Sequence, residues 1–167
     1  CVTHLFNAMS QFAGREPGLV GAALDRTDLF CGLIADGVHV HPAALRLAWA
    51  AKRDRLFLVS DAMPTMGMAG DRFDLNGRRV TRRDGRLTLG DGTLAGADPP
   101  LIYGVRVMVR QAGVPLDDAL RMASLRPAQA LGVASRHGHL RPGARADMVH
   151  LDEGLDMLGC WIGGVPA

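Results

Sequence analysis

The sequence has few cysteines, a single lysine and no long apolar run, and each shortage disfavours a class of protein. Among its 167 residues only Cys1, Cys31 and Cys160 are cysteines. This odd, sparse set predicts no disulfide framework and favours a reducing, cytoplasmic setting. No apolar run approaches ~18 residues, so we expect no membrane-spanning helix and no membrane partner. No segment has the pattern of a signal peptide. Lys52 is the only lysine, which we interpret as a compositional bias of the genome.

Nucleic-acid binding and several common catalytic motifs are also disfavoured. The net charge of +2 is too small to predict a nucleic-acid partner. No Cys-x-x-Cys, Gly-x-Ser-x-Gly or phosphate-loop motif occurs. Hydrophobic residues make up 48% and charged residues 22%, which is typical of a globular domain with its own core. The chain begins with Cys1 rather than Met, inside a predicted strand, so we expect the natural N-terminus to lie upstream.

Three apolar segments alternate with helical ones, which predicts an α/β fold with parallel strands. The predicted strands are residues 1–4, 29–36 and 56–61, and the predicted helices between them are residues 19–26 and 42–53. Residues 56–59 are consecutively apolar, so we expect that strand to be buried on both faces. His4, His39 and Asp61 fall at or just after the three strand ends. In such folds the loops at those ends form the ligand-binding crevice.

The second half has a different pattern. Residues 71–89 are predicted to form an antiparallel ribbon, with turns at Asn76-Gly77 and Asp84-Gly85. Residues 92–97 are expected to form a glycine-spaced loop. Further helices are predicted at 101–111, 116–124 and 127–131, and further strands at 147–151 and 160–162.

The polar residues at the strand ends suit hydrolysis, although each also has a structural explanation. Asp61 could cap a helix or anchor a loop, His4 could be a hydrogen-bonded core residue, and His41 could face the start of a helix. If these residues form an active site, a divalent metal would lower the pKa of bound water to ~7. Asp61 would then take a proton from that water and transfer it to a leaving group. His39 would stabilise the oxyanion, and Arg15 would bind an anionic group. Because one residue for each role is present, we favour the active site.

The sequence also resembles a known family, the N-acetylglucosamine-6-phosphate deacetylases of the amidohydrolase superfamily. The resemblance lies in Thr3–Met9, Gly14–Gly18, Asp36–Val40, Leu58–Ala62 and Gly92–Gly96. The tail, residues 138–149, is similar to the C-terminal β-sandwich segment of the superfamily in general. The resemblance implies that residues 1–135 are the C-terminal part of a (β/α)8 TIM-type barrel, with a β-hairpin insertion near 71–90. Residues 136–167 would belong to a small β-sandwich domain.

The implied activity is metal-dependent hydrolysis of the N-acetyl group of N-acetylglucosamine 6-phosphate, giving glucosamine 6-phosphate and acetate. The matching positions imply a metal ligand at His4, the catalytic acid/base at Asp61 and no catalytic role for His41. The implied substrate-binding residues are Asn7, Ala8, Arg15, His39 and a covering loop of Leu94, Ala95, Gly96 and Ala97. In the family, the arginine that matches Arg15 can serve the site of a neighbouring subunit. Zinc is the expected divalent metal, a phosphorylated N-acetyl amino sugar the expected partner, and a homodimer the expected full-length form.

Two departures from the family pattern leave alternatives open. The family's other metal ligands, a glutamate and a histidine, have no counterpart here, and Ala97-Asp98-Pro99-Pro100 replaces the usual Ser and Leu-Thr-Met. One ligand cannot hold a catalytic ion, so we expect these residues alone to bind no stoichiometric zinc. The alternatives are an N-acetylgalactosamine-6-phosphate deacetylase, a cyclic-amide hydrolase, and an inactive fragment or a subunit that completes its barrel with another polypeptide.

Overall fold

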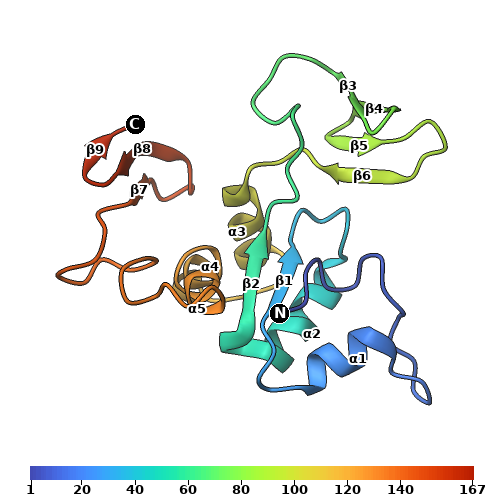
Figure 1. Cartoon of the computed structure of the whole chain (residues 1–167), viewed down its shortest axis with the longest axis horizontal. Helices are drawn as coiled ribbons and strands as arrows, with labels where there is room; N and C mark the ends of the chain where they lie inside the picture. The colour runs from blue at the N-terminus through green and yellow to red at the C-terminus, as the bar shows by residue number, and fades with distance from the viewer.

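The computed structural model describes all residues, 1–167. A short parallel sheet lies at the centre, with helices packed on one side of it (Figure 1). Two antiparallel sheets lie at the periphery, one formed by β3–β6 and the other by β7–β9 (Figure 1). The fold is therefore mixed α/β, as the alternating pattern of apolar strands and helices predicts, and its parallel strands do not close into a barrel.

The central sheet consists of β1 (Cys31–Ile34) and β2 (Leu56–Val59), which pair in parallel with Cys31 opposite Leu56. Residue Val2 adds a parallel bridge to Cys31 on the other side of β1. The order is therefore the N-terminal segment, β1, β2, which agrees with the three predicted strands, although the first is only one bridge long. Their carboxyl ends lie at the same edge of the sheet.

The helices are α1 (Gly18–Asp25), α2 (Pro42–Lys52), a 3-10 turn η1 (Arg53–Arg55), α3 (Leu101–Arg110), α4 (Leu116–Ala123) and α5 (Leu125–Ala130). The apolar sides of α1, α2, α3 and α4 and one face of the central sheet contribute most of a single buried cluster of 18 residues. Leu33 and Leu45 are fully buried in it. Burying a leucine side chain contributes roughly 1.5–3 kcal/mol, so this cluster is what fixes the strands on the helices.

The expectation that residues 56–59 are buried on both faces is wrong. Leu56 and Leu58 are buried among the helices, whereas Phe57 and Val59, on the opposite face, are only half-buried. Side chains alternate between the two faces of a strand, so Phe57 and Val59 share the face opposite to that of Leu56 and Leu58. Phe57 instead lies against Gly32 of the neighbouring strand, where an added Cβ would be 3.2 Å from its ring.

The antiparallel ribbon is confirmed and is larger than expected. It consists of β3 (Arg72–Leu75), β4 (Arg78–Arg83), β5 (Arg86–Thr88) and β6 (Leu94–Ala97). Asn76 and Asp84 each adopt a positive φ before a glycine, the conformation that the predicted Asn-Gly and Asp-Gly turns require. The expectation of a loop over residues 92–97 is wrong, because residues 94–97 pair with β5 as a fourth strand.

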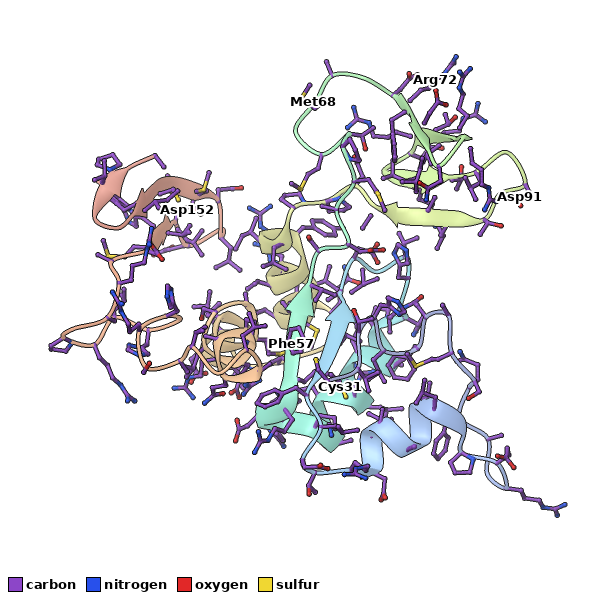
Figure 2. All side chains as sticks on the ribbon, viewed as in Figure 1. Cys31, Phe57, Met68, Arg72, Asp91 and Asp152 are labelled. Atoms are coloured by element: carbon purple, nitrogen blue, oxygen red, sulfur yellow. The ribbon has the colours of Figure 1, made fainter.

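The C-terminal sheet consists of β7 (Met148–Leu151), β8 (Met157–Ile162) and β9 (Val165–Pro166). The strands predicted at 147–151 and 160–162 are found, and β8 begins three residues earlier than expected. Asp152 lies on the connection between β7 and β8 (Figure 2). Side chains of α3 contact this connection, where Arg110 donates to the Gly154 carbonyl oxygen at 3.0 Å. All three cysteines are free, and no helix has the length and apolar character needed to cross a bilayer.

Candidate active site

The N-terminal segment leaves the sheet at His4. The Leu5 N–H donates to the Gly32 carbonyl oxygen at 2.8 Å, which holds this segment beside β1. The His4 Nδ1 lies 2.9 Å from the Asn7 carbonyl oxygen. Because a carbonyl only accepts, Nδ1 carries a proton, and in the neutral ring Nε2 has a free lone pair. A carbonyl partner of this kind is the usual support of a metal-binding histidine.

The residues expected to hold a phosphate follow directly. The Asn7 side-chain amide donates to the Leu5 carbonyl oxygen at 3.3 Å, and Ala8 is exposed with φ +51°. Arg15 lies on the exposed loop before α1 and forms no ion pair within the chain. Asn7 and Ala8 are thus placed beside His4, whereas Arg15 projects from a separate surface loop.

His39 is held by a neighbouring carboxylate. Its Nδ1 lies 2.6 Å from Asp36 Oδ2, and the two side chains are only 7% and 8% exposed. Asp36 Oδ1 accepts the backbone N–H groups of Val38 and His39 at 2.9 Å and 2.8 Å. β1 ends at Ile34, so His39 lies on the loop beyond the strand rather than at its end. The sequence reasoning missed Asp36, although an Asp three residues before a His, followed by a glycine, is a signal for this kind of turn.

Each side chain of this pair favours the charged form of the other. The hydrogen bond to Asp36 raises the pKa of His39 above its ordinary value against the effect of burial, and the negative charges of Asp36 and Asp61 add to the rise. Burial raises the pKa of Asp36, but the hydrogen bonds that it accepts outweigh burial and hold its pKa below the ordinary value. Asp36 is therefore ionised at neutral pH, and Nδ1 of His39 carries a proton.

Asp61 is fixed through its backbone while its carboxylate is left free. It adopts φ +53°, a left-handed conformation that few residues other than Gly, Asn and Asp adopt. Its carbonyl oxygen accepts the Ala97 N–H at 2.7 Å, and the Met63 N–H donates to the Ala97 carbonyl oxygen at 3.3 Å. The carboxylate makes no hydrogen bond or ion pair within the chain. Strain that the surrounding structure maintains is common at functional sites.

The strand β6 therefore lies against Asp61, which the resemblance alone did not indicate. Ala62 and Ala97 form a parallel bridge. Gly96 has φ +83°, and an added Cβ would lie 2.4 Å from Met63 Cγ and 3.0 Å from the Asp61 carbonyl oxygen. A glycine is required there because both the backbone conformation and the close approach exclude a side chain. Residues 94–97 are thus part of the scaffold of Asp61.

Arg82 of β4 connects the loop after Asp61 to the residues after β6. Its guanidinium donates to the carbonyl oxygens of Thr65, Met68 and Gly70 at 3.1, 2.7 and 2.8 Å. It also pairs with Asp98 at 3.2 Å. Met68 lies on the long loop that leads from β2 into β3 (Figure 2). Asp98, one of the departures from the family pattern, therefore has a structural partner that the sequence reasoning did not identify.

His41 acts as a helix cap. Its Nδ1 accepts the Ala43 N–H at 3.2 Å at the start of α2. The interpretation that His41 faces the helix start is confirmed.

Among the candidate residues, His39, Asp61 and His4 lie at or beyond the ends of neighbouring parallel segments of the sheet. The charge of Asp61 acts on His39, and His4 follows the segment on the other side of β1. All three therefore belong to the carboxyl edge of neighbouring parallel strands. His4, Phe6, Ala8 and Asp61 in these segments all have positive φ.

A cavity of about 480 Å³ lies at the opposite edge of the sheet, lined by Phe30, Asp54, Arg55, Gln129, Gly132, Ala134 and Ser135. Phe30 and Arg55 directly precede β1 and β2, so this cavity is at the amino ends of the strands. It contains none of the candidate residues. The chemistry-bearing side chains are at the other edge, where ligands bind in parallel α/β folds.

Comparison with known proteins identifies the family. The family model described as "Amidohydrolase family" matches residues 1–164. The chain belongs to the amidohydrolase family. It is 43% identical to a putative N-acetylgalactosamine-6-phosphate deacetylase of Escherichia coli K12, over 96% of both chains. It is 42% identical to the N-acetylglucosamine-6-phosphate deacetylase of Bos taurus, over 98% of this chain and 41% of that protein. The chain thus spans nearly the whole of one relative and about two-fifths of the other.

Solved structures agree with this assignment. The N-acetylglucosamine-6-phosphate deacetylase of Pasteurella multocida superposes with a TM-score of 0.96 at 38% identity, over 99% of this chain and 44% of that one. A mutant of the Mycobacterium smegmatis enzyme, crystallised with N-acetyl-D-glucosamine-6-phosphate, superposes with a TM-score of 0.90 at 35% identity, over 98% of this chain and 44% of that one. This amidohydrolase is therefore homologous to the C-terminal part of amino-sugar-phosphate deacetylases.

Amidohydrolases are typically metal-dependent, but the residues of this chain do not by themselves fit a catalytic metal. No three His, Cys, Asp or Glu side chains are grouped so that they could hold an ion, whereas catalytic zinc takes about three protein ligands. His4 has the orientation of a single ligand, with its Nδ1 held by the Asn7 carbonyl oxygen.

Proposed function

We propose that this chain carries the acid/base and substrate-binding part of a deacetylase that hydrolyses N-acetylglucosamine 6-phosphate to glucosamine 6-phosphate and acetate. The observation that carries the proposal is that an unpaired carboxylate, Asp61, lies near enough to His39 for its charge to act on the ring. One is a carboxylate with no partner in the chain, and the other is an imidazole whose pKa is raised, chiefly by its hydrogen bond to Asp36. Relatives at 42–43% identity that are named as amino-sugar-phosphate deacetylases support it.

The roles follow from the chemistry of amide hydrolysis. A water oxygen adds to the acetamide carbonyl carbon, and Asp61 accepts the proton that it loses. The carbonyl oxygen becomes an oxyanion, to which the protonated His39 donates a hydrogen bond. The carbon–nitrogen bond then breaks, and Asp61 returns the proton to the departing amine. The products are a free amino sugar and acetate.

The remaining candidate residues suit the phosphate and the substrate cover. Asn7 and Ala8 lie beside His4, where they would contact the phosphate, and Arg15 would add a cation from an exposed loop. Residues 94–97 hold the Asp61 backbone and border the same edge of the sheet. We propose that His4 contributes one ligand to a divalent ion, with zinc the expected metal, whose other ligands lie outside this chain.

The proposed architecture follows the same comparison. Residues 1–135 would be the C-terminal part of a (β/α)8 barrel, with the β3–β6 sheet as an insertion, and residues 136–167 would belong to a β-sandwich. The superposition at TM-score 0.96 over 44% of a deacetylase supports this division. The homodimer of the full-length form remains a proposal that rests on the family resemblance.

A specific observation favours a second candidate substrate. The relative that this chain matches over 96% of both lengths is a putative N-acetylgalactosamine-6-phosphate deacetylase. The two sugars differ only in the configuration of one hydroxyl. The residues described above would contact the phosphate and the acetamide, which both sugars have, so they do not distinguish the two substrates.

Acetate release by the intact protein tests the proposal. The substrates are the 6-phosphates of N-acetylglucosamine and N-acetylgalactosamine, each compared with its unphosphorylated sugar. We expect release from a phosphorylated sugar and much slower release from the unphosphorylated controls. A preference for the glucosamine epimer would support the proposal, and a preference for the galactosamine epimer would support the second candidate instead. Arg15→Ala is expected to raise KM for the phosphorylated sugar and to leave the unphosphorylated control unchanged. Equal rates with and without the phosphate would contradict the assignment of Asn7, Ala8 and Arg15.

A further inference from the structure

We propose that Asp36 is a positioning residue for His39 that keeps Nδ1 protonated and leaves Nε2 as the ring atom presented to the substrate. The catalytic consequence of this inference rests on the proposed function, because Nε2 would contact the carbonyl group of the substrate. The relation between the two side chains is independent of that function, and it can be measured in this chain.

The geometry leaves the ring little freedom. Nδ1 lies 2.6 Å from Asp36 Oδ2, and both side chains are more than nine-tenths buried. The other carboxylate oxygen accepts the N–H groups of Val38 and His39, so the carboxylate is itself fixed. Gly37 allows the turn with φ +74°, and the nearest atom to an added Cβ there is 3.8 Å away. Its conformation rather than lack of space is therefore what requires glycine.

The consequence is a specific protonation pattern. An ionised carboxylate accepts only, so a neutral His39 has its proton on Nδ1 and a lone pair on Nε2. Nε2 can then donate to a carbonyl oxygen only when the ring is a cation. Asp36 favours that cation, as does the charge of Asp61, and these two carboxylates are the ionisable groups that act on the ring. His39 would therefore stabilise an oxyanion with a full positive charge. The attraction between the two charges is stronger in this largely buried site than it would be in water.

The same arrangement explains why Asn would be a poor substitute for Asp36. In Asp36→Asn the amide oxygen can still accept the backbone N–H groups, while the amide NH₂ faces Nδ1. The ring then has to accept at Nδ1 and carry its proton on Nε2. The shape of the turn is preserved, whereas the tautomer is reversed and the stabilisation of the cation is lost.

Nitrogen-15 NMR of the imidazole rings in the 167-residue chain tests this. His39→Gln assigns the resonance, and the other five histidines are internal controls. In the wild type we expect Nδ1 to remain protonated through the titration, with a pKa above the ordinary histidine value of 6.5. Asp36→Asn should switch the neutral form to Nε2–H and lower the pKa, and Asp61→Asn should lower the pKa and keep the tautomer. Asp28→Asn, a matched change at an exposed ion pair, should alter neither.

The outcomes separate the inference from the proposed function. An Nε2–H tautomer in wild-type His39 overturns the inference, and this measurement needs no variant to fold. An unchanged tautomer and pKa in Asp36→Asn, with the other histidine signals preserved, also overturns it. N-acetylglucosamine 6-phosphate is added last, and we expect a shift of Nε2 in the wild type and a weaker one in Asp36→Asn. If His39 of the wild type shows the expected tautomer but no signal shifts when the sugar is added, the result would count against the proposed function alone.

Discussion

The close approach of β6 to Asp61 makes Gly96→Ala the most informative single perturbation of the scaffold. The change adds one methyl group at φ +83°, with Met63 Cγ at 2.4 Å and Cε at 2.6 Å, and the Asp61 carbonyl oxygen at 3.0 Å. The backbone conformation alone costs about 1–2 kcal/mol for a residue with a Cβ. Met63 can move aside, but the Asp61 backbone cannot without loss of the bond to Ala97. Forced repacking of this kind adds about 1–3 kcal/mol, so we expect a total of about 2–5 kcal/mol.

Gly92→Ala is the matched control, because Gly92 has φ +85° and no atom within 4 Å of an added Cβ. It should cost only the conformational part, about 1–2 kcal/mol. Urea unfolding followed by circular dichroism gives the free energy of unfolding of both variants. Amide NMR of Asp61 and Ala97 should show a displaced hydrogen bond only in Gly96→Ala. Equal losses of stability in the two variants would refute the claim that β6 packs against Asp61.

Three further predictions concern Arg82 and its carbonyl partners, the buried core and the pH dependence of stability. Arg82→Ala should cost about 2 kcal/mol and expose residues 65–70 to limited proteolysis, whereas Arg79→Ala, at an exposed ion pair, should change neither. Leu33→Ala, in the fully buried core, should lower the free energy of unfolding by about 2–5 kcal/mol. For His39 the folded pKa is raised, so its contribution to stability is complete below its ordinary pKa of 6.5 and is lost as pH rises through the folded pKa. For Asp36 the folded pKa is lowered, so its contribution is lost as pH falls through that value. Denaturation curves across pH should show both slopes in the wild type and weaker slopes in Asp36→Asn, and slopes of unchanged size in the variant would contradict the pairing.

The elements that local patterns specify were predictable from the sequence. Apolar runs with helices between them indicate the parallel strands, because those strands are short and bounded by turn residues. Asn76-Gly77 and Asp84-Gly85 specify their hairpins because few other pairs adopt two positive φ values. The role of His41 was also predictable, since it directly precedes a proline that opens a helix.

The features that were not predictable depend on residues far apart in the sequence. β6 is a strand because residues 94–97 meet both β5 and the segment at Asp61, and neither partner is visible in a glycine-spaced stretch. The half-exposed face of Phe57 and Val59 reflects what the chain places over that face, which strand composition does not encode. Arg82 was one arginine among several in an exposed ribbon, and only its partners distinguish it.

The central claim is that Asp61 transfers the proton in amide hydrolysis, and turnover by Asp61→Asn in the intact protein tests it most directly. The substitution keeps the size of the side chain and removes the only group proposed to accept and return the proton. Acetate release from N-acetylglucosamine 6-phosphate is compared at equal metal content, measured in both proteins. We predict that turnover falls by about 10²–10⁴-fold, the usual contribution of general acid–base catalysis, with metal content unchanged. Near-normal turnover in Asp61→Asn would contradict the account.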